Sequence, residues 1–186
     1  MKNSKRILVF TLGIVLIVSA SILLYHLIIR VIYPVRYSEY IEENSEKYNL
    51  DKYLVMSVIK AESNYIYDAH SGVARGLMQI TDETALWISK QLDIEFNHDD
   101  IENPEKNIEM GCFYLNYLIS HYKNTDVALA AYNAGMGNVN KWLSTPEYSD
   151  DGKTLSRIPY KETREYVKKV NKYQQKYKDL YSKKTQ

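Results

Sequence analysis

ESNYIYDAHSGVARGLMQI, residues 62–80, carries most of the functional information in this 186-residue sequence. The residues before it, 51–61, repeat apolar side chains at helical spacing, which predicts a helix with one buried stripe formed by Leu54, Val55, Val58 and Ile59. Glu62 lies four residues after Val58, so its side chain projects from that stripe. A carboxyl group on an apolar face is costly to ionise, and desolvation raises its pKa. Glu62 is therefore the candidate general acid; the alternative interpretation is an ordinary surface glutamate at a helix end.

The second half of this stretch predicts a turn followed by an apolar segment. Gly76 stands at the turn, Leu77, Met78 and Gln79 follow it, and a helix start is expected at Thr81. A neutral amide and a thioether near a candidate acid suit a ligand rich in hydroxyl and amide groups better than a phosphate. Met78 and Gln79 are therefore candidate ligand-binding residues.

Four short motifs occur in order along the chain: Glu62-Ser63, Ala69-x-Ser71, Gly76-Leu-Met-Gln79 and Ala131-Tyr-Asn-Ala-Gly135. Each motif alone is weak, but the ordered set resembles the catalytic domain of the soluble lytic transglycosylases. The resemblance extends over residues 40–173. It implies an all-α, lysozyme-like domain that cleaves peptidoglycan.

The resemblance also implies roles for individual side chains. Ser71 matches the family serine that contacts substrate near the acid, while Tyr132 and Asn133 match the segment that lines the sugar-binding groove. Tyr166 matches the cleft tyrosine of the C-terminal motif. Two features depart from the family pattern: Tyr67 stands where the family often has proline, and the interval after Ser71 is one residue shorter. Without the resemblance, Ser71 would be interpreted as a turn serine that bonds its own backbone.

The reaction implied by the family needs only one carboxylate, whereas glycosidases ordinarily pair two. Glu62 would protonate the glycosidic oxygen between N-acetylmuramic acid and N-acetylglucosamine. As a carboxylate it would then take a proton from the muramoyl C6 hydroxyl, which closes a 1,6-anhydro ring. Two alternatives stay open: a lysozyme-type hydrolase on the same fold, and a non-catalytic cell-wall-binding module. A role as scaffold in a secretion or conjugation machine is compatible with enzymatic activity, and no motif points to a particular partner.

Composition excludes several other classes of protein. A formal net charge of +1 argues against a dedicated nucleic-acid binder. The single cysteine, Cys112, excludes an intramolecular disulfide framework and a cysteine-rich zinc site, and its position on an apolar stripe predicts a buried, inert thiol. The histidines at positions 26, 70, 98 and 121 lack ligand-like spacing. We therefore expect neither a metal nor an organic cofactor.

The N-terminal segment predicts a membrane helix. Residues 7–29 contain no formally charged side chain, and as a helix they would extend ~35 Å, enough for a hydrocarbon core of ~30 Å. Lys2, Lys5 and Arg6 precede this segment, which favours a cytoplasmic N-terminus. We expect an uncleaved signal-anchor in the cytoplasmic membrane with the following domain outside the cytoplasm. A signal peptide cleaved after Val18-Ser19-Ala20 is the alternative, although the apolar run is long for one.

The expected organisation has five parts: a cytoplasmic N-terminus at 1–6, a transmembrane helix at 7–29, a linker at 30–37, the lytic transglycosylase domain at 38–181 and a basic tail at 182–186. Within the domain we expect a first helix capped by Ser38, a loop between Asn64 and Arg75, and a last helix that starts near Ile158. Trp87 is expected in the core.

Overall fold

The computed structural model describes residues 2–95 and 97–182, and the chain divides into two compact units, Met1–Arg36 and Tyr37–Gln186. Most of the predicted basic tail, residues 183–186, lies outside the described residues. The prediction for that tail is therefore not addressed by the structure.

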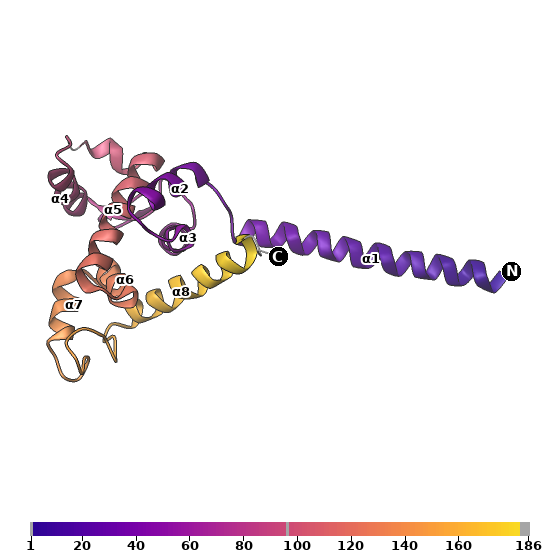
Figure 1. Cartoon of the computed structure of the whole chain (residues 1–186). Coiled ribbons are helices and arrows are strands. Elements are labelled where there is room, and N and C mark those ends of the chain that lie inside the picture. Colours follow the sequence, from indigo (N-terminus) through magenta and orange to yellow (C-terminus); the bar gives the residue numbers. More distant parts are fainter. Residues whose placement is uncertain (1, 96, 183–186) are drawn as a thin grey trace. The chain divides into compact units, whose positions relative to one another are not determined.

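The first unit consists of helix α1 (Lys2–Ile32), drawn in indigo in Figure 1. Its segment Phe10–Ile32 has a mean hydropathy of 2.5, is not buried by the protein, and is long and apolar enough to cross a membrane. Ser19 and Ser21 donate hydrogen bonds of 2.8 Å to the carbonyls of Val15 and Ile17, so these hydroxyls are satisfied within the helix. The helix continues three residues beyond the predicted end at Ile29 and includes Arg30 in its last turn.

The second unit is built mainly from helices (Figure 1). In the described part of this unit, three two-residue strands and one 3-10 turn interrupt them. In chain order the elements are α2 (Ser38–Lys47), α3 (Lys52–Glu62), β1 (His70–Ser71), β2 (Ala74–Arg75), β3 (Ile80–Thr81), α4 (Asp82–Leu92), η1 (His98–Ile101), α5 (Pro104–Tyr122), α6 (Thr125–Ala134), α7 (Met136–Leu143) and α8 (Lys161–Tyr181).

Helices α3, α5, α6 and α8 enclose the core: α3 packs on α8, α5 on α6, and α6 on α8. Helix α6 is rich in alanine, and its fully buried side chains from Val127 to Ala131 allow close approach of its neighbours. Helix α5 contributes a buried stripe that includes Ile108, Cys112, Leu115 and Leu118. Cys112 is fully buried and burial raises the pKa of its thiol, which confirms the expected inert cysteine.

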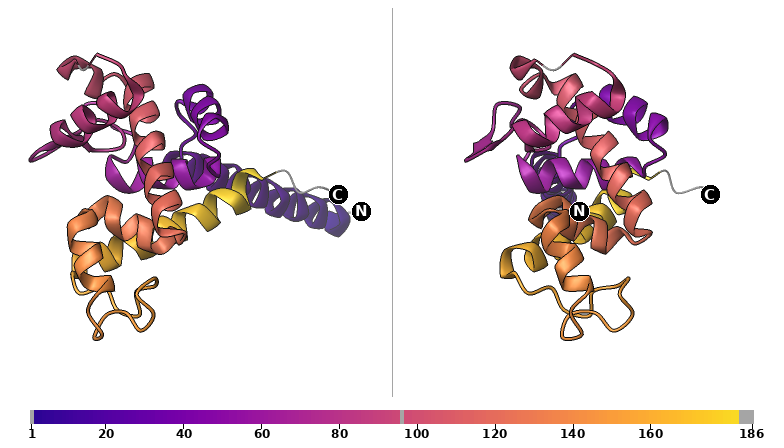
Figure 2. Two further views of the ribbon diagram at one scale, coloured as in Figure 1. Left: turned by 60° about the vertical axis from the view of Figure 1, so that its left-hand side comes forward. Right: turned by 90° about the vertical axis from the view of Figure 1, so that its left-hand side faces the viewer.

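The predicted loop between Asn64 and Arg75 contains the first half of a small antiparallel ribbon, ordered β1-β2-β3. Its β1–β2 turn projects from the helical body in Figure 2. Gly76 follows β2 with φ of +80°, where a Cβ atom would collide with the side chain of Asn107 and the carbonyl of Ile101. The glycine is therefore required both by its backbone conformation and by close packing.

Asn107, on the first turns of α5, joins the ribbon to the helical body. Its Oδ1 accepts a 2.7 Å hydrogen bond from the backbone N–H of Met78. Its Nδ2 donates to the carbonyls of Ile101 at 2.7 Å and Arg75 at 3.1 Å. Because the Asn107 side chain is fully buried, water cannot take its place. Its three hydrogen bonds therefore satisfy the backbone groups of Met78, Ile101 and Arg75.

Three local expectations were wrong. Ser38 is the first residue of α2 rather than its cap, because Tyr37 occupies the cap position with a left-handed backbone. The last helix starts at Lys161 rather than near Ile158. Trp87 is half-buried and packs edge-on against Tyr117, with ring centroids 4.7 Å apart, instead of filling the core.

Replacing Asn107 by alanine should destabilise the second unit strongly. The change removes the hydrogen-bond partner of the buried Met78 N–H and one donor to each of the Ile101 and Arg75 carbonyls, which we expect to lower the free energy of unfolding by about 2–4 kcal/mol. Urea unfolding of the detergent-solubilised chain measures this. Asn116→Ala, at a half-buried position of the same helix where the side chain accepts one long hydrogen bond of 3.4 Å from Ser120, should change it by less than about 0.5 kcal/mol. Equal effects of the two substitutions would contradict the role assigned to Asn107.

Candidate active site

Glu62 is the last residue of α3, a helix fixed at its start by a cap. Asp51 accepts a 2.9 Å hydrogen bond from the backbone N–H of Tyr53 and thereby satisfies one free donor of the first turn. The second oxygen of Asp51 is bound by Gln174 at 2.9 Å and by Lys178 at 2.6 Å, both on α8. The helix that carries the candidate acid is therefore tied to α8 at the end farthest from it.

Burial raises the pKa of Glu62 to about 7. Its side chain is only partly exposed, and it lies two residues after a run of α3 in which every side chain from Leu54 to Lys60 is buried. The carbonyl end of the helix dipole acts in the same direction, because it disfavours a negative charge. At neutral pH a substantial fraction of this carboxyl group is protonated, and it retains access to solvent through which a substrate can approach.

Two tyrosines lie beside Glu62 and come from different helices, Tyr132 from α6 and Tyr166 from α8. Desolvation raises the pKa of both phenols well above the usual value, and the Glu62 carboxylate raises them further. Tyr132 donates a 2.8 Å hydrogen bond to the carbonyl of Met78, which fixes its ring. The structure thus brings three of the predicted site residues together.

The hydroxyl of Tyr166 is buried and has no hydrogen-bond partner of good geometry among the described residues. It nevertheless lies close enough to the Glu62 carboxyl to lower the pKa of that acid as a donor. The phenol is therefore placed to stabilise Glu62 when it ionises.

Sequence reasoning missed two further charged residues of α8 that act on Glu62. The ammonium group of Lys169 donates a 2.8 Å hydrogen bond to the carbonyl of Ala61 and lowers the pKa of Glu62, whereas the charge of Glu162 raises it. Glu162, Tyr166 and Lys169 recur at i, i+4 and i+7, so they lie on one helix face. That spacing, read outward from Tyr166, would have found them.

Gln79 and Ser71 lie in the small ribbon and contact each other. Ser71 is exposed and donates to the side-chain oxygen of Gln79. The Gln79 amide nitrogen donates to the carbonyls of Ala69 and Gly76, each at 2.9 Å. In the free protein this side chain therefore holds the ribbon together, and Ser71 bonds a neighbouring side chain rather than its own backbone. Their contact with substrate stays a prediction.

Met78 and Asn133 occupy different environments from each other. The Met78 side chain is fully buried and fills the space that Gly111 leaves open on α5, while its carbonyl receives the Tyr132 hydroxyl. Asn133 is half-buried on the last turn of α6, directly after Tyr132. Substrate contact by either residue also stays a prediction, and for Met78 the structure points to support of the tyrosine.

An aromatic-lined pocket of about 360 Å³ adjoins this site. Trp87, Tyr114 and Tyr117 line it, together with the glycine and methionine between α6 and α7. The rings of Tyr114 and Tyr132 lie 5.5 Å apart, so the pocket begins one side chain away from Glu62 and its tyrosines. In the part of the chain that the structure describes, no group of three or more His, Cys, Asp or Glu side chains could hold a metal ion.

Comparison with known proteins places this geometry in a family context. Residues 39–155 match the model of the transglycosylase SLT domain. The chain is 35% identical over 158 residues to a putative soluble lytic murein transglycosylase of Haemophilus influenzae, with 81% of this chain and 26% of the relative covered. It is 30% identical over 169 residues to membrane-bound lytic murein transglycosylase C of Glaesserella parasuis, with 78% and 46% covered. The chain spans about a quarter of the length of the soluble relatives.

Solved structures agree with this match. An inactive glutamate-to-glutamine mutant of lytic transglycosylase Slt from Pseudomonas aeruginosa superposes with a TM-score of 0.72 at 30% identity, covering 81% of this chain and 25% of that one. The 70 kDa soluble lytic transglycosylase of Escherichia coli gives the same TM-score over 82% of this chain and 25% of its own. The all-α, lysozyme-like fold expected from the sequence is confirmed.

The raised pKa of Glu62 predicts a specific pH dependence of stability. Between the ordinary value of 4.5 and about 7, the folded protein retains a proton that the unfolded chain releases, so stability falls as pH rises through this window. Glu62→Gln removes this pH-dependent loss of stability, because glutamine does not ionise. Above pH 7 we expect the variant to be more stable than wild type by roughly 1–3 kcal/mol, and the difference should vanish below pH 4.5.

Urea unfolding across this pH range measures the difference. Glu43→Gln, at an exposed position of α2, serves as the matched control and should show no such trend. A stability difference between Glu62→Gln and wild type that stays constant with pH would contradict the raised pKa.

Proposed function

This chain belongs to the family of SLT transglycosylase domains, and from that premise we propose that it is a membrane-anchored lytic transglycosylase. In this proposal it cleaves the β-1,4 bond between N-acetylmuramic acid and N-acetylglucosamine in peptidoglycan and leaves 1,6-anhydro ends. The relatives named murein transglycosylases support the substrate class. The observation that carries the chemistry is Glu62, with a pKa raised to about 7, beside two tyrosines.

The first step is transfer of the Glu62 proton to the glycosidic oxygen. The C1–O bond of the muramoyl residue then breaks, and its electron pair leaves with the protonated oxygen of N-acetylglucosamine. The acetamido carbonyl of the muramoyl residue stabilises the positive charge at C1. A carboxyl group whose pKa lies near the working pH suits this step, because it holds a proton in the resting state and releases it readily.

The second step returns the proton. The Glu62 carboxylate accepts the proton of the muramoyl C6 hydroxyl while O6 attacks C1, which closes the anhydro ring and restores the acid. No external co-reactant is consumed. The Tyr166 hydroxyl, buried next to Glu62, stabilises the carboxylate between the steps. Tyr132, Tyr166 and the Met78 backbone form the wall that keeps water from competing with O6.

Ser71, Gln79 and Asn133 would orient the sugars in this scheme. Gln79 and Ser71 already form a hydrogen-bonded unit within the ribbon, so a sugar hydroxyl or acetamide can exchange with one of these bonds without reorganising the backbone. Asn133, the residue after Tyr132 on α6, offers a half-buried amide. Met78 acts indirectly, because its carbonyl accepts the hydrogen bond that positions Tyr132.

Replacement of Glu62 by glutamine should abolish turnover. Glutamine keeps the size of the side chain but cannot donate and recover a proton, so we expect release of fragments from purified peptidoglycan to fall by about 10³-fold. Mass spectrometry of the fragments made by wild type should show 1,6-anhydro ends. Glu43→Gln serves as the control with wild-type turnover.

Each of the other possible outcomes would indicate a different function for this protein. Fragments with ordinary reducing ends would mean a lysozyme-type hydrolase. Equal release of fragments by wild type and Glu62→Gln would mean that Glu62 is not the acid, and no release by the folded wild type would favour a non-catalytic wall-binding module.

We further propose that α1 is a signal-anchor of the cytoplasmic membrane and that Tyr37–Gln186 lies outside the cytoplasm. The apolar segment Phe10–Ile32 and the membrane-bound relatives support membrane association. Lys2, Lys5 and Arg6 on its N-terminal side favour the orientation.

The topology is testable in intact cells stripped of their wall. Externally added protease should degrade the second unit while an epitope placed at the N-terminus survives on a short membrane-bound fragment. Full protection of the second unit would reverse the orientation. A released protein that starts near Ser21 would show that the segment is a cleaved signal peptide.

A further inference from the structure

The carbonyl end of α3, where Glu62 stands, is completed by a side chain from another helix. The last carbonyl groups of a helix have no partners within it and must find donors elsewhere. The backbone N–H groups of the two residues that follow the helix donate to the carbonyls of Ile59 and Lys60, at 3.0 and 3.2 Å. The next carbonyl in this series is that of Ala61.

The backbone cannot supply the donor for Ala61, because the chain leaves the helical path. Asn64 and Tyr65 both have a left-handed backbone, with φ of 51° and 66°. The N–H group of Tyr65, four residues after Ala61, donates instead to the hydroxyl of Ser63 at 3.1 Å. The Ala61 carbonyl is therefore left for a donor from outside the helix.

Lys169 of α8 is that donor. Its ammonium nitrogen lies 2.8 Å from the Ala61 carbonyl oxygen, although the two residues are 108 positions apart in the chain. The packing of α3 on α8 creates this contact. The Ala61 carbonyl and the Glu62 nitrogen belong to one planar peptide group. Lys169 thus brings a positive charge to the peptide group at which the candidate acid begins.

The groups that face Glu62 come from α6 and α8. They are the phenols of Tyr132 and Tyr166 and the charged side chains of Glu162 and Lys169. Burial raises the pKa of Glu62 to about 7, while the Tyr166 hydroxyl and the Lys169 charge lower it. Of these groups, Lys169 carries the positive charge, and it stands where a cation offsets the negative end of the helix dipole.

A second ammonium group lies near Lys169 on α3 itself. Lys60 donates a 3.0 Å hydrogen bond to the side chain of Asn64 and lies 5.1 Å from the centre of the Tyr173 ring. Burial lowers the pKa of Lys60, and the charge of Lys169 lowers it further. Two like charges are thus held together at the end of the helix that carries the acid. Such perturbed groups concentrate at functional sites.

We propose that Lys169 is a positioning residue for the reaction at Glu62: its ammonium group closes the carbonyl end of α3 and favours the carboxylate between the two proton transfers. Without this cation, the ionised acid would face the helix dipole and the charge of Glu162 with less compensation. The inference rests on the proposed function for the reaction itself.

The titration of Glu62 tests the electrostatic part directly. Lys169→Met removes the charge and the donor but keeps a long side chain. We expect the midpoint of the Glu62 titration to move to higher pH by about 0.5 pH unit, as for one partly exposed charge. Carbon-13 NMR of the glutamate carboxyl groups measures it on the full chain in detergent, and the signal missing from Glu62→Gln identifies the group.

Turnover on purified peptidoglycan tests the role in the reaction. Because the first step needs protonated Glu62, the alkaline limb of the kcat profile should move to higher pH together with the titration. We expect kcat at its optimum to fall about threefold, since a weaker acid releases its proton less readily. KM should not change, because Lys169 binds a backbone carbonyl rather than the sugar. Lys169→Arg should restore both the profile and kcat.

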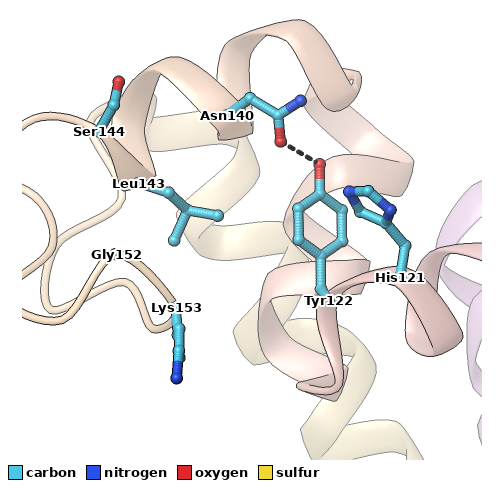
Figure 3. Close-up of a pocket in the computed structure, with 7 residues that line it drawn as sticks. All are labelled: His121, Tyr122, Asn140, Leu143, Ser144, Gly152 and Lys153. Carbon is cyan, nitrogen blue, oxygen red and sulfur yellow. Dashed lines mark hydrogen bonds between the residues drawn. The ribbon is translucent and has the colours of Figure 1, made fainter.

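Two lysines of the same chain serve as matched controls. Lys168 is the exposed neighbour of Lys169 and pairs with Glu165 at 3.3 Å. Lys153 is exposed in the loop after α7, where it lines a pocket of about 510 Å³ that includes none of the groups acting on Glu62 (Figure 3). Lys168→Met and Lys153→Met remove the same charge and should leave the Glu62 midpoint and the kcat profile unchanged.

Circular dichroism and thermal melting establish which variants fold, and Lys169→Gln replaces Lys169→Met if the latter unfolds. An unmoved Glu62 midpoint in a folded variant overturns the inference. An equal movement in Lys153→Met also overturns it, because the effect would then follow net charge. A kcat profile that stays in place while the midpoint moves removes Lys169 from the reaction.

The titration requires no turnover, which separates this inference from the proposed function. A protein that leaves anhydro ends but shows an unmoved midpoint in Lys169→Met retains the proposed function and loses the inference. A protein whose midpoint moves but which releases no fragments retains the link between Lys169 and Glu62 and loses the proposed function.

Discussion

The burial of one carboxyl group at the end of α3 is the constraint on which the rest of the domain depends. A partly enclosed acid is unfavourable for folding once it ionises, so the surrounding elements must hold it firmly enough that it cannot simply turn outward. Helix α8 does this from one side and α6 from another, each contributing a tyrosine. The long α3–α8 contact is therefore part of the site as well as part of the core.

The support of Glu62 extends beyond the residues that touch it. Tyr132 is fixed by the carbonyl of Met78, and the backbone of Met78 is fixed by Asn107. Asn107 also defines the position of the glycine turn, because no side chain fits between the two. A chain of hydrogen bonds thus connects the start of α5, the ribbon and the tyrosine beside the acid. Such a chain sets the geometry of the site more narrowly than packing alone.

Much of this could be predicted from the sequence. The apolar spacing before Glu62 placed a carboxyl group on a buried helix face, and the ordered motifs indicated the fold. The ribbon could not be predicted because its strands have two residues each, too short for a periodic signal. Composition does not show the influence of Lys169, since a lysine on a polar helix face looks the same whether it meets water or a carbonyl; only its spacing from Tyr166 indicates it. Trp87 was misplaced because an aromatic residue in a helix signals contact with other rings but not how deeply they are buried.

Side chains of α8 bind α3 near both of its ends. Lys178 and Gln174 bind the Asp51 cap at one end, and Lys169 binds the Ala61 carbonyl at the other. Two attachments, one near each end of an eleven-residue helix, prevent it from pivoting against its neighbour. On the other side of the site, the Asn107 side chain joins the ribbon to α5, and the ion pairs of Arg75 join it to Asp82 of α4 and to Glu102. The acid is therefore carried by a helix whose orientation on α8 is fixed near both of its ends.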